Sequence, residues 1–172
     1  MALIDDDVSI GGHQILRLTE RRDHLDFLAA RLRPVARHLV VLHGGMSAKE
    51  RRAALAALGE IPAPEERAVI ATGRFIGEGF DDPRLDTLVL AMPIAWRGTL
   101  VQYAGRLHRL HAGKCEVRIY DYLDAQVPVL ASMFRKRNRG YRALGYEPAD
   151  EEPGRTPPRE LTIEYDLDQD SE

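Results

Sequence analysis

The stretch Val69–Arg109, VIATGRFIGEGFDDPRLDTLVLAMPIAWRGTLVQYAGRLHR, decides the fold of this chain. It holds an apolar segment, a loop broken by glycines, a second apolar segment, and a segment with helical spacing that ends in arginines. Continuous apolar runs of this length are typical of parallel strands covered on both faces. Arg106 and Arg109 stand three residues apart, and on a helix this spacing puts both guanidinium groups on one face. Because guanidinium groups grip phosphate oxygens in forked geometry, we expect a phosphate-handling surface here.

Strands and helices alternate along the rest of the chain. We expect strands at 13–18, 38–42, 68–72, 85–92 and 117–122, and helices at 20–32, 47–58, from 99 to the arginines, and 127–144. Strand and helix units repeated at this spacing predict an α/β domain with a central, mostly parallel sheet and helices on both faces.

Helix boundaries carry their own signals. Hydroxyl residues should cap three of the helices: Thr19, Ser47 with Glu50 as a capping box, and Thr99 with Gln102 as a second capping box. Pro34 should end the first helix and Gly59 the second.

Composition indicates one globular domain. A chain of 172 residues with 44% apolar and 30% charged residues can bury a core of ordinary size. No apolar run approaches the ~20 residues needed to cross a bilayer, and the N-terminus lacks the pattern of a secretory signal. Cys115 is the single cysteine, which excludes an internal disulfide and a thiol-rich zinc site. This cysteine usage fits a reducing cytosol, so we expect a cytoplasmic protein without membrane contact.

Charge divides the chain unevenly. We expect a linker at 1–12, a domain at 13–149, and an acidic, flexible tail at 150–172 that includes a possible edge strand at 161–167. The tail holds nine acidic and two basic residues, so the rest of the chain carries +4 although the net charge is −3. A basic body is compatible with a nucleic-acid partner.

Ligands of an open parallel sheet bind at the carboxyl ends of its strands. This rule collects small, hydroxyl and basic residues: Thr19, Arg21, His43, Gly44, Ser47, Thr72, Gly73 and, further on, Glu78–Asp81. Such residues, at helix N-termini with free N–H groups, suit a sugar-phosphate backbone.

Each of these residues also has a structural interpretation. Ser47 and Thr99 are explained as helix caps, His43 and Gly79 as turn residues, and Trp96 as a core aromatic. The arginine pair, and the last helix's Lys136, Arg137, Arg139 and Arg142, are explained as solvated faces.

The order and spacing of the motifs over residues 13–145 resemble the second RecA-like domain of superfamily 2 helicases of the DEAD/DEAH type. These proteins are nucleic-acid-dependent ATPases with a three-layer fold. The matching segments are Leu16–Arg21 (motif IV), His43, Gly44 and Ser47 (the next nucleic-acid loop), Ala71–Gly73 with Glu78–Asp81 (motif V), and Gln102–Arg109, which reads Q-x-x-G-R-x-x-R (motif VI). The sequences of residues 77–86 and 97–109 are similar to those of helicases of restriction and phage-defence systems.

The resemblance implies roles for these residues. Arg109 would be an arginine finger toward the γ-phosphate of ATP, Arg106 its companion, and Gln102 the residue that orients them. Asp81 would bind the ribose, and Gly79 would permit close approach. The phosphates of DNA or RNA would be held by Thr19, Arg21, His43, Gly44, Ser47, Thr72 and Gly73.

Two motifs of a complete motor are missing from the sequence. No G-x-x-x-x-G-K-[ST] occurs, since Gly113-Lys114 lacks the earlier glycine and is followed by Cys115, and no acidic D-E-x-[DH] box follows a strand. The resemblance therefore implies that ATP is shared with an N-terminal RecA-like domain, in cis or in trans, and that Mg²⁺ binds only through that domain. We expect the chain alone to hydrolyse no ATP, as the C-terminal half of a longer protein or as a solitary half-motor.

Two alternatives remain. The chain could be a non-catalytic nucleic-acid-binding or protein-docking module that keeps this fold. A generic nucleotide-binding domain is disfavoured because no glycine-rich loop follows the first strand; Gly11-Gly12 precedes it.

Overall fold

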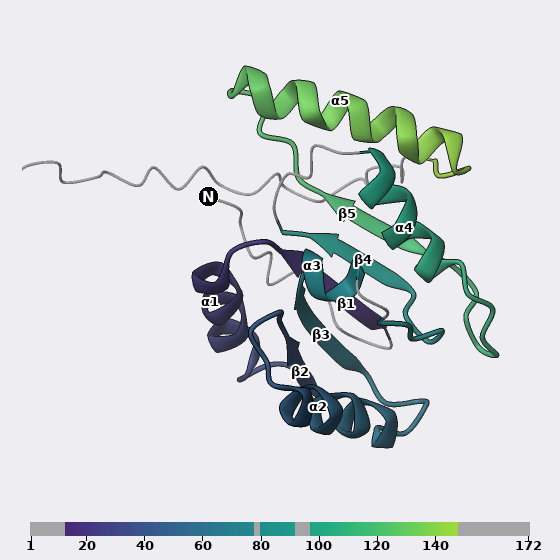
Figure 1. Cartoon of the computed structure of the whole chain (residues 1–172). Coiled ribbons are helices and arrows are strands. Elements are labelled where there is room, and N and C mark those ends of the chain that lie inside the picture. The colour runs from purple at the N-terminus through teal and green to yellow at the C-terminus, as the bar shows by residue number, and fades with distance from the viewer. Residues whose placement is uncertain (1–12, 78–79, 92–96, 148–172) are drawn as a thin grey trace, which may run out of the picture.

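The computed structural model describes residues 13–77, 80–91 and 97–147 (Figure 1). Ten elements follow one another: β1 (Gln14–Thr19), α1 (Arg22–Leu32), β2 (Leu39–Leu42), α2 (Ala48–Glu60), β3 (Arg67–Thr72), α3 (Gly73–Gly77), β4 (Thr87–Leu90), α4 (Arg97–Leu107), β5 (Arg118–Asp121) and α5 (Pro128–Ala143). The predicted linker at 1–12, the tail at 150–172 with its edge strand, Gly79 and Trp96 lie outside the described residues.

The five strands form one sheet in the order β2-β3-β1-β4-β5, and every neighbouring pair is parallel. All residues of β1 and β4 are buried, and only Thr72 of β3 is partly exposed. Burial on both faces explains why these strands are continuously apolar instead of alternating. The predicted α/β fold with a parallel sheet is confirmed.

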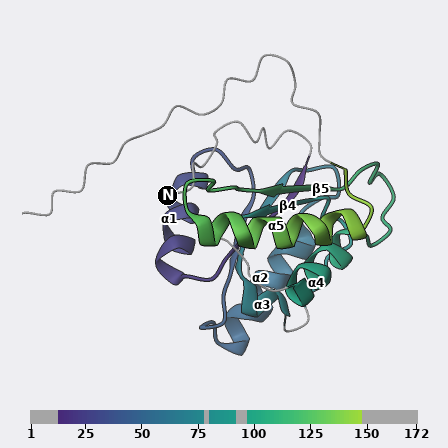
Figure 2. The same ribbon diagram turned by 90° about the horizontal axis from the view of Figure 1, so that it is seen from above.

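Helices cover both faces of the sheet. The main core lies under α2, α3 and α4, where residues such as Leu58, Phe75 and Leu100 pack on the strands. On the other face, α1 packs its leucines against Ile70 of β3. Val69 and Ala71 of β3 belong to the first core and Ile70 to the second, so the two cores lie on opposite faces of the sheet. Figure 2 shows α5 lying beside α4. Each buried leucine contributes about 1.5–3 kcal/mol relative to an exposed one, so these apolar faces hold the three layers together.

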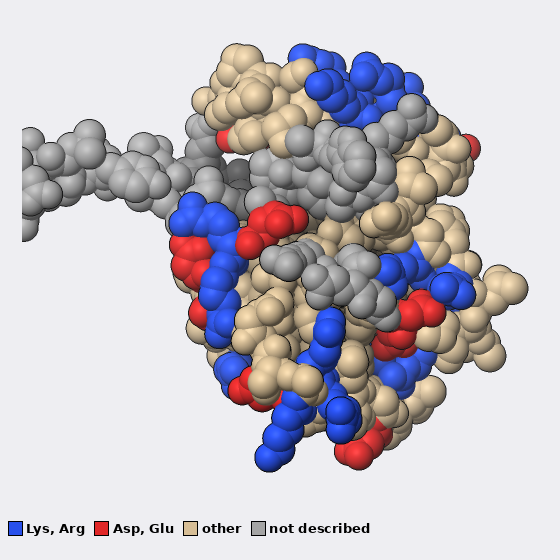
Figure 3. Space-filling model, in the orientation of Figure 1, with Lys and Arg blue, Asp and Glu red and all other residues tan. Residues whose placement is uncertain are grey.

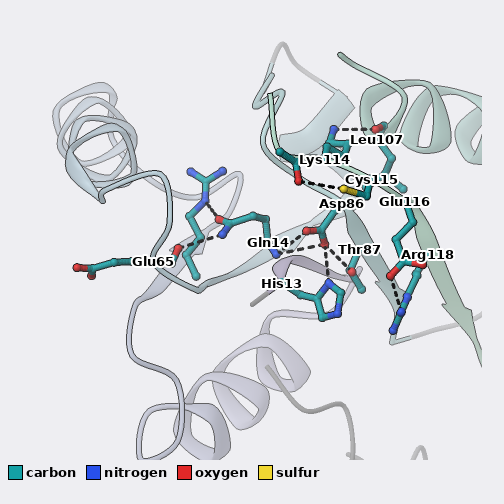
Figure 4. A network of polar contacts seen from close by, with 12 residues as sticks. His13, Gln14, Glu65, Asp86, Thr87, Leu107, Lys114, Cys115, Glu116 and Arg118 are labelled. Atoms are coloured by element: carbon teal, nitrogen blue, oxygen red, sulfur yellow. Dashed lines mark hydrogen bonds and ion pairs between the residues drawn. The ribbon is translucent and has the colours of Figure 1, made fainter. Parts of the chain in front are cut away.

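The amino edge of the sheet is tied by the carboxylate of Asp86, just before β4 (Figure 4). It accepts hydrogen bonds from the Gln14 backbone N–H at 3.1 and 3.2 Å and from the Thr87 hydroxyl at 2.6 Å. These contacts fix the starts of β1 and β4 beside each other.

Two of the predicted helix caps are wrong. Thr19 is the last residue of β1, and α1 begins at Arg22 with Arg21 as its N-cap residue. The Thr19 hydroxyl instead forms a 2.9 Å hydrogen bond with Nδ1 of His24. Thr99 is not an N-cap because α4 already begins at Arg97. The Ser47 capping box is confirmed: Glu50 N donates to Ser47 Oγ at 3.2 Å, and Ser47 N donates to Glu50 Oε2 at 2.8 Å.

Gly59 does not end α2, which continues to Glu60. The helix ends because Pro62 forces the residue before it into an extended conformation, and Ile61 indeed has φ −64° and ψ 124°. The glycine-broken loop predicted after β3 begins with a short helix, α3. Its residues Phe75 and Ile76 are buried in the main core, so tertiary packing organises this segment.

The prediction that Arg137 lies on a solvated face is wrong: this residue is buried, with 3% of its surface exposed. Its guanidinium pairs with Asp121 at the end of β5. Lys136, Arg139 and Arg142 on the same helix are exposed, as expected. Within the described residues, none of the helices combines the length and apolar character needed to span a membrane.

Candidate functional site

Helix α4 presents one apolar and one polar face. Leu100, Tyr103 and Leu107 are buried against the sheet, whereas Gln102 is exposed and Arg106 is half-buried. Gln102 and Arg106 stand four residues apart and therefore share a face. The helix ends at Leu107, so Arg109 lies in the turn after it, and the prediction that both arginines share one helical face is wrong.

Both arginines nevertheless contact the same short segment. Arg106 Nη1 donates a hydrogen bond to the Phe80 carbonyl, and Arg109 Nη2 lies 3.3 Å from Asp81 Oδ2. Phe80 is buried, with its ring 6.5 Å from that of Phe75, so the backbone acceptor for Arg106 is held by the core. The structure thus brings Asp81, Arg106 and Arg109 together, although they are far apart in sequence.

The two contacts differ in strength. The Arg109 and Asp81 side chains are 59% and 42% exposed, and an ion pair so exposed contributes about 0–1 kcal/mol. An incoming anion can therefore replace Asp81 as the partner of the Arg109 guanidinium with little loss of free energy. Within the described part of the chain, no carboxylate pairs with Arg106, so its positive charge is also available.

A cavity of about 400 Å³ adjoins this cluster. Its walls are the end of α2 and the segment from Phe80 to Arg84, with the leucine side chains Leu55 and Leu58 facing Asp81 and Asp82. An apolar wall beside an exposed carboxylate can hold a sugar through hydrogen bonds to its hydroxyl groups.

Asp82, next to the exposed Asp81, is a buried anchor. Its carboxylate pairs with Arg67 Nη1 at 2.7 Å and accepts from Arg84 N at 3.1 Å. Burial disfavours its ionised form, but the Arg67 hydrogen bond and charge hold the pKa of Asp82 below its ordinary value. Arg84 in turn donates to the Leu58 and Ile61 carbonyls at the end of α2, both at 2.9 Å. These bonds fix the backbone that carries Asp81.

The cluster lies toward the amino ends of the strands. Asp82 pairs with Arg67, the first residue of β3, and α4 runs from the carboxyl end of β4 back toward the start of β5. The prediction that Asp81 joins the carboxyl-edge residues is therefore wrong. The neighbouring carboxylate of Asp82 is already paired with Arg67 and Arg84. In the described ranges, no three His, Cys, Asp or Glu side chains lie close enough together to hold a metal ion.

Residues expected to bind nucleic acid gather at the opposite edge. Thr19 and Thr72 are register partners, and His43 follows Leu42, which pairs with Ala71. His43, Thr72 and Thr19 thus end β2, β3 and β1 at the same level. Gly44 and Ser47 are exposed beside them, on the way to α2.

Members of this edge set differ in accessibility. Thr19 is 1% exposed. Gly73 is buried, and a Cβ there would lie 2.5 Å from Glu20 Oε1 and 2.7 Å from the Tyr103 hydroxyl, so this glycine provides close packing. Arg21 is exposed and paired with Asp23 at 2.5 Å. The surface of this edge is therefore formed mainly by the loop after β2 and the half-buried Thr72.

His43 is held by neighbouring groups. Arg22 Nη1 lies 3.0 and 2.8 Å from the two ring nitrogens, and the Gly45 N–H donates to Nδ1 at 3.2 Å. Burial lowers the pKa of His43, and the charge of Arg22 lowers it further, so the ring is neutral at pH 7. A cavity of about 590 Å³ between α1 and β2 is lined by Arg22, Arg33 and His43 among others.

Two residues that position the site were not found from the sequence. The Tyr103 hydroxyl donates to the Gly73 carbonyl at 2.9 Å and joins α4 to α3; burial raises the pKa of Tyr103 to about 12, and the charge of Glu20 adds to this. Lys114 Nζ donates to the Leu107 carbonyl at 2.9 Å (Figure 4) and to the Arg109 carbonyl at 2.8 Å. A basic residue soon after a helix end is a capping signal that could have revealed Lys114. Helical spacing marks Tyr103 only as a core residue.

Comparisons with known proteins match this architecture. Residues 3–111 match the family described as "Helicase conserved C-terminal domain". "Uncharacterized protein 108L" of Invertebrate iridescent virus 3 is 37% identical over 84 residues, which are 49% of this chain and 76% of that protein.

Several solved structures have a similar fold. The C-terminal domain of the DEAD-box protein Dbp5 has a TM-score of 0.59 and 18% identity, covering 78% of this chain and 71% of that chain. The C-terminal part of the Fun30 ATPase domain has a TM-score of 0.59 and 16% identity, covering 72% of this chain and 38% of that chain. The ATP-dependent Type ISP restriction-modification enzyme LlaBIII bound to DNA has a TM-score of 0.57 and 23% identity, covering 76% and 10%.

Because the sequence identities of these structures are low, their likeness establishes the fold alone. The family match covers most of the chain. This chain spans only 38% and 10% of the Fun30 and LlaBIII chains. The chain belongs to the helicase conserved C-terminal domain family and has a RecA-like α/β fold.

Proposed function

We propose that this chain is the second motor domain of an ATP-dependent nucleic-acid helicase or translocase. The observation that carries the proposal is the cluster in which Arg106 and Arg109 contact the Phe80–Asp81 segment. Two guanidinium groups and a carboxylate there can receive a nucleotide presented by another domain. Gln102, on the same face of α4 as Arg106, completes the polar surface.

ATP would supply the γ-phosphoryl group whose transfer to water drives the motor. Arg109 leaves its weak pair with Asp81 and points to that phosphate, and Arg106 stays anchored to the core through Phe80. Positive charge placed there stabilises the charge that develops during phosphoryl transfer, and such arginines contribute ~10³–10⁵ in rate. Asp81, once released, accepts hydrogen bonds from ribose hydroxyls at the edge of the 400 Å³ cavity.

The chain supplies only part of this site. It lacks a phosphate-binding loop, and Asp82 is already neutralised by Arg67 and Arg84. Mg²⁺ and the other phosphates belong to the P-loop domain. We therefore propose that the chain alone does not turn over ATP.

The residues at the carboxyl ends of β1, β2 and β3 would hold the phosphates of the nucleic acid. His43, Gly44, Ser47 and Thr72 border the open part of this edge, with Arg21 nearby. Contacts to phosphate carry little sequence preference and weaken steeply with salt. They apply to DNA and RNA alike.

A direct connection joins the two sites. Tyr103 of α4 donates to the carbonyl of Gly73, the residue after Thr72 at the end of β3. Movement of α4 when the arginines engage a nucleotide would therefore reach the strand end that contacts nucleic acid. Alternate closure and opening of the two domains would then shift one grip on the strand past the other.

The test is ATP hydrolysis with and without a P-loop domain. Phosphate release is measured for the chain alone, for the chain mixed with or joined to the P-loop domain, and for the Arg109→Ala and Arg109→Lys variants, each with nucleic acid present. We expect no turnover alone, and turnover with the partner domain that falls at least ~10³-fold in Arg109→Ala. Arg31→Ala, an exposed arginine of α1, is the control and should retain full activity.

Turnover by the chain alone, or equal turnover for Arg109→Ala and the parent, would contradict the motor proposal. The second candidate, a non-catalytic binding or docking module, is favoured by the exposed basic face of α5. It predicts nucleic-acid or protein binding without any Arg109-dependent hydrolysis in the same assay.

A further inference from the structure

The second half of helix α5 carries a basic surface. Four exposed cations, Arg135, Lys136, Arg139 and Arg142, occupy its second half and are called the α5 strip here. The 16 residues of α5 include no acidic residue. Figure 3 shows basic side chains gathered over α5 at the top of the molecule.

The strip has a defined direction. Arg135, Arg139 and Arg142 are spaced i, i+4 and i+7, so they share one face of the helix over a length of about 10 Å at 1.5 Å per residue. The opposite face carries Arg137 and Gly140, which are buried. The cations therefore point away from the domain.

The helix is held firmly under this strip. Arg137 makes two hydrogen bonds to Asp121, at 2.6 and 2.9 Å, and Tyr141 makes a third at 2.7 Å. A Cβ on Gly140 would lie 3.2 Å from Leu100 of α4, which shows how closely the two helices pack. In contrast, the cations of the strip make no ion pair with any carboxylate in the part of the chain that the structure describes.

The strip is separate from the sites discussed above. It lies outside residues 3–111, the stretch that matches the helicase family. It is also distant from the carboxyl edge of the sheet, because α5 starts after β5 and runs back toward the amino ends of the strands, with the strip in its last turns.

We propose that the α5 strip binds the phosphate backbone of duplex nucleic acid, as a second contact beside the strand at the sheet edge; this rests on the proposed function. A duplex presents one negative charge per ~1.7 Å of its axis, so a rigid row of cations meets phosphates whatever the rotation of the duplex. Arginine forks bind such oxygens well. The aromatic residues of α5, Phe134 and Tyr141, are both partly buried, and the Tyr141 hydroxyl is bonded to Asp121, so neither offers an open ring for an unstacked base; this favours duplex over single strands.

The test compares two double variants of the full chain that lose equal charge. Arg135→Gln/Arg139→Gln removes half the strip, and the control Arg31→Gln/Arg52→Gln removes two exposed arginines, one on α1 and one on α2. Fluorescence anisotropy is measured over a salt series with a labelled blunt duplex of about 20 base pairs and with one of its strands alone. Far-UV circular dichroism checks that all variants are folded.

We expect the strip variant to lose duplex affinity and to lower the slope of log affinity against log salt by about 2, at ~0.9 per phosphate contact. Its affinity for the single strand and both affinities of the control variant should stay at the parent values. Equal loss in both variants, loss on the single strand alone, unchanged duplex binding, or stronger binding to vesicles of anionic lipid than to duplex would overturn the proposal.

These outcomes are distinct from a failure of the motor. If ATP hydrolysis depends on Arg109 but duplex affinity is the same in the parent and the strip variant, only the proposal for the α5 strip is refuted. If the strip variant loses duplex affinity but hydrolysis does not depend on Arg109, the motor proposal is refuted and the α5 strip is supported as a binding surface.

Discussion

Arg137 in α5 and Asp121 at the end of β5 form a buried, two-bonded ion pair. The Nε to Oδ2 distance is 2.6 Å and the Nη2 to Oδ1 distance is 2.9 Å, with 3% and 6% of the two side chains exposed. The Tyr141 hydroxyl donates to the same carboxylate at 2.7 Å. The last helix is thus attached to the edge strand of the sheet by a specific polar contact as well as by apolar packing.

Replacing Arg137 with glutamine should destabilise the domain by about 3–5 kcal/mol, because Asp121 would be left as a buried charge without a cation. The free energy of unfolding is measured by urea denaturation. Arg139→Gln, on the exposed face two residues later, is the matched control and should change stability by less than about 0.5 kcal/mol. Similar losses in both variants would show that the pair is not structural.

Gly73→Ala should destabilise the domain by about 1–3 kcal/mol, because its methyl group would enter space held by Glu20 and the Tyr103 hydroxyl. Gly59→Ala, inside α2 with no atom within 4 Å of the new Cβ, should instead stabilise it by about 0.5–1 kcal/mol. Thermal and urea unfolding of the two variants should therefore move in opposite directions, and parallel shifts would refute the packing role of Gly73.

Lys114→Met should loosen the turn that carries Arg109. The Leu107 and Arg109 carbonyls would lose their cationic donor, at a cost of about 1–2 kcal/mol for partly exposed charged hydrogen bonds. Amide hydrogen exchange should accelerate at residues 107–111 and stay unchanged in β1. Lys136→Met, an exposed lysine, is the control. Unchanged exchange after Lys114→Met would mean that the turn is held by other contacts.

Acid should weaken the fold below pH ~6.5 through His24 and His43. Burial lowers the pKa of both histidines, so the unfolded state takes up protons first, and stability falls as the pH drops from the unfolded pKa to the folded one. Each histidine contributes less than about 1.4 kcal/mol per pH unit, the limit for one proton. His24→Gln and His43→Gln should each flatten the profile of urea stability from pH 7 to pH 5, and the double variant should flatten it most. A double variant with the parent slope would exclude these two rings.

Strand signals in the sequence were reliable where the strands are buried on both faces. The five predicted strands all occur, with ends shifted by one or two residues, because continuous apolar runs have no other stable location in this fold. The Ser47 capping box was also predicted, since its two hydrogen bonds lie within four residues. Thr19 and Thr99 failed as caps because a hydroxyl residue near a helix start does not determine where the first turn begins.

The candidate site was only partly predictable. Motif spacing identified Arg106, Arg109 and Asp81, and the structure brings them together. It did not indicate that α4 ends before Arg109, or that Asp81 lies toward the amino edge of the sheet. Both depend on contacts between distant segments, Lys114 with the end of α4 and Asp82 with Arg67.

By itself, the sequence determined the alternation of strands and helices, the parallel sheet and the residues that carry charge, since these follow from local periodicity and capping. Only the tertiary structure decided which charges are buried and which remain free. Arg137 and Arg139 are nearly identical in local sequence context, yet one is buried against Asp121 and the other faces solvent. Burial depends on what packs against a helix face, and that partner lies in a strand elsewhere in the chain.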